Sequence, residues 1–249
     1  MRRMLRRMAL AAFGGLLLLP VSLVGQSGQH PDFTGVWTTY TEPAQPGAAA
    51  PAGRGGGAPL PLTAEAQKKV AAYRALIGNS GATPGGFCLG TGMPGSMLGS
   101  GGYPMEILQR PDQINITYEA HNEVRRVYLG DRIVPMEDRL PGRNGFSSAR
   151  WDGDTLVVET THLVEQVEPR IPHSDQAKIV ERYRLTTDSA GKKVLVAEMT
   201  MTDPVFYTKP VVETKKWAYV PNGHVLPYEC AEEGWRVHLE ELERKADRK

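Results

Sequence analysis

The sequence predicts a mainly β protein in which an antiparallel meander of strands closes into a β-barrel, with one helix near residues 63–77 and another at the C-terminus. From residue 103 onward, short β-rich runs alternate with turn residues, which indicates consecutive hairpins. One face of such a run also carries both polar and large apolar side chains. In the run over residues 178–187, for example, Glu181 and Tyr183 lie on the same face. A barrel around a partly polar cavity needs such faces, although rim or edge positions that face water would show the same pattern.

The individual elements follow from turn and capping residues. Asp152 and Gly153 form the dipeptide preferred by a type I′ turn and so predict one tight hairpin. The helix over residues 63–77 is expected to begin at Thr63, whose hydroxyl can accept an amide hydrogen bond from the first turn. The Gly-rich residues 78–102 are expected to wrap the surface of the fold. The strands of the meander are expected over residues 106–110, 113–119, 123–129, 147–151, 155–162, 178–187, 192–202, 211–220 and 224–228.

Three further regions accompany a single barrel domain, which is expected over residues 29–230. Residues 1–28 carry an arginine-rich start, a short apolar run and small residues, which together are typical of a secretory signal peptide and too short to span a membrane comfortably. Residues 42–61 consist almost entirely of Pro, Ala and Gly, so we expect a flexible loop within the domain. Residues 231–249 alternate acidic and basic side chains around a few apolar ones, which predicts a solvated amphipathic helix.

The charge balance restricts the class of partner. The chain has 29 Lys plus Arg and 28 Asp plus Glu, which gives a formal net charge of +1. A nucleic-acid-binding protein or a polybasic membrane adaptor would need a basic surplus that the chain lacks beyond its first residues. We therefore expect a small-molecule ligand, no nucleic acid and no stable membrane anchor, in a protein that is periplasmic or secreted. Arg6 and Arg7 leave twin-arginine export open beside ordinary export.

Two cysteines, Cys88 and Cys230, lie beyond the predicted signal peptide. An even count in an exported chain suggests one disulfide, which would tie the Gly-rich segment to the end of the last strand. Two independent buried thiols are the alternative. Two thiols alone do not form a zinc site.

A Gly-x-Trp sequence, Gly35-Val36-Trp37, opens the first strand of the mature protein. It resembles the motif that closes the base of lipocalin-type barrels. The resemblance implies that the indole packs across the barrel bottom against a basic side chain from a late strand. The helix-containing, Gly/Pro-rich segment that follows is an insertion that lipocalins lack, so the chain is lipocalin-like in the broad, calycin sense. Three basic residues could take the place beside the indole: Lys215, Lys216 and Arg236.

A second resemblance covers most of the mature domain. Four blocks look like those of a family of exported bacterial proteins whose function is uncharacterised. The resemblance implies secretion and a shared fold, and it supplies no activity. The blocks are residues 103–107, 150–160, 172–175 and 180–183.

The strongest candidate for catalysis is His173 with Asp175, in the longer connection between residues 163 and 178. Loops at a barrel mouth can bring reactive groups to a ligand, and an imidazole paired with a carboxylate can act as a general acid or base. The alternative is a local turn, because Ser174 and Asp175 readily hydrogen-bond to nearby backbone. On this second interpretation His173 has no chemical role.

Further residues are expected to bind the ligand. Arg125 and Arg126 fall on opposite faces of one strand, so one of them should point into the barrel, where it could bind a carboxylate through two hydrogen bonds. His121 could join His173 and Asp175 in a metal site, but no spacing places these residues on one face, so we expect neither a metal nor another cofactor. The other predicted ligand-binding residues are Tyr118, His121, Glu181 and Tyr207.

Three functions remain open on the sequence alone. The first is an exported enzyme of the lyase, isomerase or hydrolase type, which uses cofactor-independent acid/base chemistry on a partly apolar organic molecule in the barrel cavity. The second is a non-catalytic carrier of a small hydrophobic ligand in the same cavity. The third is a structural or interaction domain without a ligand.

Overall fold

The structure is a computed structural model, and it describes most of the chain. The described residues are 30–42, 59–78, 80, 83–99, 102–168, 170–230, 234, 236, 237, 239, 240 and 244. The predicted signal peptide over residues 1–28 lies outside the described residues, as does most of the predicted loop over residues 42–61.

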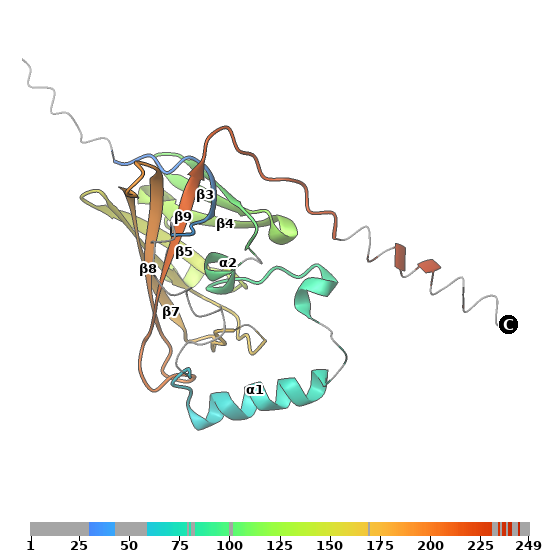
Figure 1. The fold of residues 1–249 in the computed structure, drawn as a ribbon. Coiled ribbons are helices and arrows are strands. Elements are labelled where there is room, and N and C mark those ends of the chain that lie inside the picture. Colours follow the sequence, from blue (N-terminus) through green and yellow to red (C-terminus); the bar gives the residue numbers. More distant parts are fainter. Residues whose placement is uncertain are drawn as a thin grey trace, which may run out of the picture.

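The predicted β-barrel is confirmed: nine strands form one closed ring in which chain neighbours pair and β9 pairs with β1 (Figure 1). The pairs are antiparallel except for β4 and β5, which run parallel. A parallel pair is unavoidable, because an odd number of strands cannot alternate in direction all the way around a ring. The strands are β1 (Gly35–Thr39), β2 (Met105–Gln109), β3 (Gln113–Tyr118), β4 (Glu123–Leu129), β5 (Phe146–Asp152), β6 (Thr155–Thr161), β7 (Lys178–Thr187), β8 (Lys193–Thr202) and β9 (Val211–Val220).

The predicted helix near residues 63–77 is also confirmed as α1 (Ala64–Ile77). The Thr63 hydroxyl caps it by accepting a hydrogen bond from the Ala66 amide and also donates to the Val205 carbonyl, which ties the start of α1 to the loop between β8 and β9. In Figure 1, α1 lies beyond the end of the barrel. The shorter helices among the described residues include α2 (Gly95–Leu98) and the 3-10 helices η1 (Pro84–Phe87), η3 (Ala120–Asn122), η4 (Gly130–Arg132) and η5 (Met136–Asp138).

Two local predictions are wrong. Residues 224–228 contain no strand, because the ring closes between β9 and β1 and leaves no edge for a further strand. The Gly-rich segment does not only wrap the surface, since Met93 and Met97 are both 1% exposed and belong to the hydrophobic core. Flexible methionine side chains fill irregular gaps well, which suits them to this place. The described residues beyond 230 are helical and include Arg236 and Val237, in agreement with the predicted C-terminal helix.

A long connection, residues 130–145, joins β4 to β5 and contains η4 and η5. Strands that run parallel need such a crossover, because a tight turn reverses the chain. The connection enters β5 through Gly145, whose φ is +60° and where an added Cβ would lie 2.4 Å from the Thr161 carbonyl oxygen. Only glycine fits this position without a backbone shift.

Trp37 on β1 is fully buried and donates a hydrogen bond to the Phe33 carbonyl at 2.9 Å. The ammonium group of Lys193 lies 5.4 Å from the centre of the Trp37 ring and 5.1 Å from that of Tyr219. The Gly-x-Trp sequence therefore does place an indole beside a basic side chain. That side chain comes from Lys193 on β8, and the sequence analysis did not include it among the candidates.

The predicted disulfide between Cys88 and Cys230 is confirmed, with the two Cα atoms 5.5 Å apart. It joins the end of η1 to the chain that follows β9. Such bonds persist outside the reducing cytoplasm. None of the described helices has the length and apolar character needed to cross a membrane.

Candidate functional site

The barrel interior contains a buried ion pair between Arg125 and Glu181, which are 1% and 0% exposed. Arg125 Nη1 donates to Glu181 Oε1 at 3.0 Å, and Nη2 donates to Glu181 Oε2. Arg125 also donates to Ser147 and Thr160, while the Tyr183 hydroxyl donates to Glu181 Oε1 at 2.7 Å. The inward Arg therefore binds a carboxylate through two hydrogen bonds, as the alternation of β4 predicted, but the carboxylate belongs to the protein.

The charges of this pair are stabilised by each other. Burial is the largest influence and lowers the pKa of Arg125, but Glu181 together with Tyr183 and Tyr118 outweighs burial and leaves that pKa raised. Burial and then Glu181 raise the pKa of Tyr183, so its phenol stays protonated and remains a donor. The predicted residue Tyr118 is also buried here, and its hydroxyl has no hydrogen-bond partner among the described residues. Burial raises its pKa as well. Tyr118, Arg125 and Glu181 thus share the interior with the apolar core.

His173 lies in a different place from the one expected, because it is 0% exposed rather than accessible at a barrel mouth. Its Nε2 lies 3.0 Å from the Met93 carbonyl oxygen, and its Nδ1 lies 3.1 Å from that of Ser174. Burial lowers the pKa of His173, while the two carbonyl groups act in the opposite direction. The contact with Met93 connects the loop between β6 and β7 to the Met93 segment, and it suits a structural role. The catalytic role of His173 stays a prediction.

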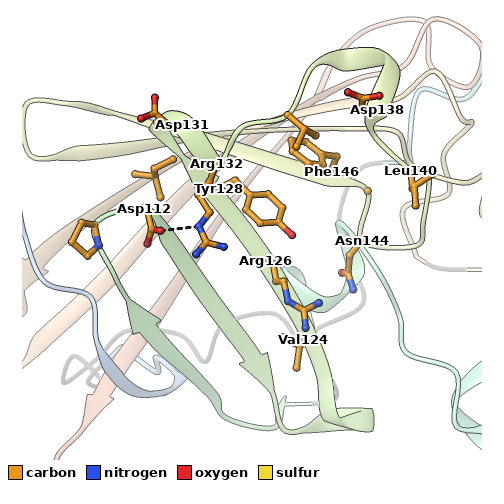
Figure 2. Close-up of a pocket in the computed structure, with 15 residues that line it drawn as sticks. Asp112, Val124, Arg126, Tyr128, Asp131, Arg132, Asp138, Leu140, Asn144 and Phe146 are labelled. Atoms are coloured by element: carbon orange, nitrogen blue, oxygen red, sulfur yellow. Dashed lines mark hydrogen bonds and ion pairs between the residues drawn. The ribbon is translucent and has the colours of Figure 1, made fainter.

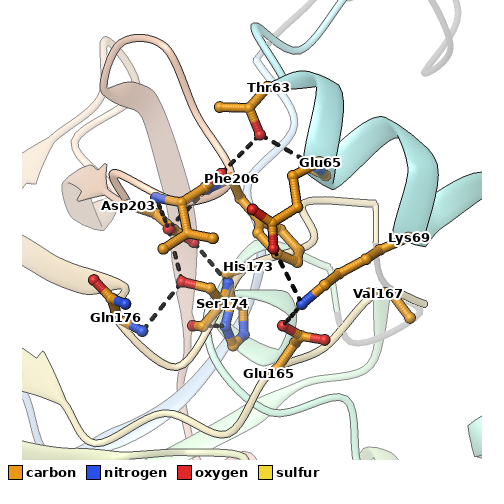
Figure 3. A network of polar contacts seen from close by, with 12 residues as sticks. Thr63, Glu65, Lys69, Glu165, Val167, His173, Ser174, Gln176, Asp203 and Phe206 are labelled. Carbon is orange, nitrogen blue, oxygen red and sulfur yellow. Dashed lines mark hydrogen bonds and ion pairs between the residues drawn. The ribbon is translucent and has the colours of Figure 1, made fainter.

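The neighbours of His173 form a buried polar network around Asp203 (Figure 3). Asp203 accepts hydrogen bonds from the Ser174 amide at 2.7 Å and from the Ser174 hydroxyl at 2.8 Å. It also accepts from the amides of Val205 and Phe206, which shapes the turn after β8. Because a carboxylate accepts several donors at once, Asp203 can join two loops that are distant in sequence.

The remaining predicted residues do not converge. Asp175 is exposed, and no contact joins its carboxylate to His173 among the described residues. The Tyr207 hydroxyl donates to the Pro172 carbonyl at 2.7 Å, so this tyrosine braces the loop that carries His173. His121 adopts a positive φ of 62° and packs edge-on against Tyr228, with ring centres 4.8 Å apart.

An open pocket with a volume of about 1070 Å³ lies outside the barrel wall, between the outer face of β4 and the crossover (Figure 2). Val124, Arg126 and Tyr128 alternate with the inward residues of β4 and form its floor. The crossover supplies Val134 and Leu140 among other residues. The pocket is thus a direct product of the parallel seam in the barrel.

Three polar groups in this pocket have no partner among the described residues. Arg126 is exposed, and its guanidinium makes no hydrogen bond or ion pair there. Tyr128 is half-buried, and its hydroxyl makes no hydrogen bond there either. Asn144 donates from Nδ2 to Glu123 at 2.8 Å, which orients its amide and leaves Oδ1 buried without a donor. Buried acceptors without a donor are uncommon in folded proteins and call for an explanation.

Apolar and charged side chains complete the pocket. The rings of Tyr128 and Phe146 stack with centres 5.2 Å apart. Asp112 is paired with Arg132 at 2.7 Å, and that hydrogen bond lowers the pKa of Asp112. Asp131 and Asp138 lie on the crossover side of the pocket, away from Arg126 (Figure 2). Arg126 is therefore the cation that remains available to a ligand in this part of the structure.

The sequence analysis identified Arg126 as ligand-binding but missed Tyr128, Asn144 and Phe146. Period-two alternation places Tyr128 on the same face as Arg126, so that signal was available. Asn144 lies in the crossover, whose path over β4 no local pattern reveals. No group of three His, Cys, Asp or Glu side chains suited to a metal ion occurs within the described residues.

Comparison of the chain with protein-family models, with curated proteins and with solved structures finds no match.

Proposed function

We propose that this is an exported carrier protein that binds a small organic acid with an apolar or aromatic body, in the pocket between β4 and the crossover. The observation that carries the proposal is the convergence of Arg126, Tyr128 and Asn144, each with an unused polar group, in a pocket that is otherwise partly apolar. Specific small-molecule sites have this composition, with a few polar groups that orient the ligand and apolar surface that holds it.

Each group suits one part of such a ligand. The Arg126 guanidinium can hold a carboxylate through two parallel hydrogen bonds. Asn144 Oδ1 can accept a hydrogen bond from a hydroxyl or amide group next to that carboxylate. The stacked rings of Tyr128 and Phe146 offer a surface on which an aromatic or aliphatic body can lie. A 2-hydroxy acid with an aromatic side chain has all three features.

Binding without conversion fits the pocket better than the acid/base chemistry predicted for His173 and Asp175. The lining residues in the described part of the chain include no His, Cys, Ser or Lys, and the carboxylate of Asp112 is already paired with Arg132. His173 is buried against two carbonyl groups elsewhere in the fold. Export is supported by the Cys88–Cys230 disulfide and by the arginine-rich, apolar start of the sequence.

Isothermal titration calorimetry with phenyllactate tests the proposal. The variants that are compared all change side chains on the outer surface of the barrel. Arg126→Gln removes the guanidinium and should weaken binding at least tenfold, since a hydrogen bond to a charged group contributes about 1.5–3 kcal/mol. Tyr128→Phe keeps the stacked ring and should weaken binding less. Arg150→Gln makes the same change of charge at an exposed position on β5 outside the pocket, and it should bind as the unchanged protein does.

Phenylethanol, which lacks the carboxylate, should bind much more weakly than phenyllactate. The carrier proposal further requires that phenyllactate be recovered unchanged after prolonged incubation. Equal binding by Arg126→Gln and Arg150→Gln would show that the pocket does not select anions. Conversion of the ligand would replace the carrier with an enzyme.

A further inference from the structure

A second pocket, with a volume of about 960 Å³, lies between η1 and the chain that follows β9. Its walls include Phe87, Tyr103 and Tyr228, and the Cys88–Cys230 disulfide joins its two sides. Neither the carrier site nor the buried ion pair involves these residues.

The pocket contains a carboxylate without a cation. Glu119 lines it, is only 9% exposed, and accepts one hydrogen bond, from the Leu226 amide to Oε2 at 2.8 Å. No Lys, Arg or His pairs with this carboxylate among the described residues. Buried carboxylates are normally paired, because removing a lone charge from water is costly. Glu229 adds a second acidic side chain to the lining, and the lining residues that the structure describes include no basic one.

Three aromatic rings line the same pocket as this carboxylate, and two of them are exposed to solvent. Phe87 is 78% exposed and Tyr103 is 45% exposed, which is unusual for large apolar side chains. The rings of Tyr103 and Tyr228 meet edge to face, with centres 5.7 Å apart. The face of an aromatic ring carries negative charge density and attracts cations.

We propose that this pocket is a binding site for an organic cation of the quaternary ammonium type, with Phe87, Tyr103 and Tyr228 around the methyl groups and Glu119 beside the charge. A quaternary ammonium has no N–H group, so it needs no ring of hydrogen-bond acceptors and loses little hydration when aromatic faces enclose it. A primary ammonium is strongly hydrated and would need more acceptors than this pocket offers. A metal ion would need further oxygen ligands beside Glu119.

The disulfide makes the site ready for its ligand before binding. Cys88 follows Phe87, and Cys230 lies two residues after Tyr228, so the covalent bond links the two segments that carry these rings. A site that is ordered in advance loses less conformational freedom on binding. Reduction of the disulfide should therefore weaken the binding of the cation severalfold.

Calorimetric titration of the oxidised full chain with choline chloride tests the site, with sodium chloride as the salt control. Neohexanol, the neutral carbon analogue of choline, has the same shape without the charge and should bind at least tenfold more weakly. Glu119→Gln keeps an acceptor for the Leu226 amide but removes the charge, so it should lower choline affinity by about tenfold or more. Tyr103→Leu should also weaken binding, whereas Tyr103→Phe keeps the ring and should retain it.

Two further variants act as controls. Glu137→Gln removes an exposed carboxylate outside the pocket and should leave choline binding unchanged. Arg126→Gln should also leave it unchanged, which separates failure of this site from failure of the proposed carrier site. Thermal melts show whether Glu119→Gln folds. If it does not, the comparison of Tyr103→Leu with Tyr103→Phe decides the question.

The trimethylammonium group could come from a free solute or from a lipid headgroup. Binding of choline with no sedimentation of the protein on phosphatidylcholine vesicles would assign a free solute, and co-sedimentation would assign the headgroup. Equal affinity for choline and neohexanol would overturn the proposal. So would choline binding that is the same in the unchanged protein, Glu119→Gln and Tyr103→Leu, or no choline binding at millimolar concentrations.

Discussion

Replacing Arg125 with Met should strongly destabilise the barrel. The guanidinium makes four hydrogen bonds, two to Glu181 and one each to Ser147 and Thr160, all inside the barrel. Without it, Glu181 stays buried at 0% exposure with Tyr183 as its remaining donor. Removing one partner of a buried ion pair costs about 3–5 kcal/mol, because the other charge is left without compensation.

Urea unfolding followed by tryptophan fluorescence, with the disulfide kept oxidised, gives the free energy of unfolding. For a domain of this size, a loss of about 3–5 kcal/mol corresponds to a fall of roughly 6–20 °C in Tm. Arg126→Met is the matched control, since the next residue on β4 faces outward and lacks a partner in the described structure. Its free energy of unfolding should change by no more than about 0.5 kcal/mol.

A triple variant, Arg125→Met with Glu181→Leu and Tyr183→Phe, should recover most of the lost stability. It removes both charges and the phenol together, while Ser147 and Thr160 keep each other as partners, with their hydroxyl oxygens 2.8 Å apart. Replacing a whole buried ion pair by apolar side chains is often neutral or stabilising. The reasoning fails if Arg125→Met loses less than about 1 kcal/mol, or if the triple variant is no more stable than the single one.

Two other stability predictions follow. His173→Asn should lose about 2 kcal/mol or more in urea unfolding, because it gives up a buried ring and contacts to Met93 and Ser174. Burial lowers the pKa of His173 in the folded state, so the stability that its neutral ring contributes is fully present above the unfolded-state pKa of about 6.5. That stability is lost as pH falls from there towards the folded-state pKa. If the free energy of unfolding of His173→Asn falls with pH just as that of the unchanged protein does, this reasoning is wrong. Cys88→Ser with Cys230→Ser opens a link across 142 residues and should lower the free energy of unfolding by about 2–5 kcal/mol, and a variant as stable as the oxidised protein would show that the bond adds nothing.

The barrel was predictable because its hairpins depend on local chemistry. Asp152-Gly153 specifies a turn, and Gly153 does adopt a positive φ of 59° between β5 and β6. Thr63 specifies a helix start in the same local way. The alternation within β4 placed Arg125 and Arg126 on opposite faces but left open which of them points inward. That choice depends on Glu181, which lies 56 residues away in sequence.

The burial of His173 was not predictable, because it depends on a contact with Met93 that spans 80 residues. The residues around His173 have no strand alternation, so no periodic pattern distinguished a buried loop from an exposed one. Met93 itself lies in a Gly-rich segment whose composition predicts a position on the surface of the fold. Tertiary packing, which local sequence does not encode, set the environment of both residues.

The position of the carrier pocket can be derived from the number of strands in the ring. Nine strands in a closed ring require one parallel pair, and here that pair is β4 and β5. A parallel pair requires a crossover, so residues 130–145 must pass over the outer surface of the barrel instead of turning tightly. The outward residues of β4 then face this segment across the pocket. A site that selects a ligand needs walls on more than one side, and on this barrel the parallel seam supplies them where Arg126 faces outward.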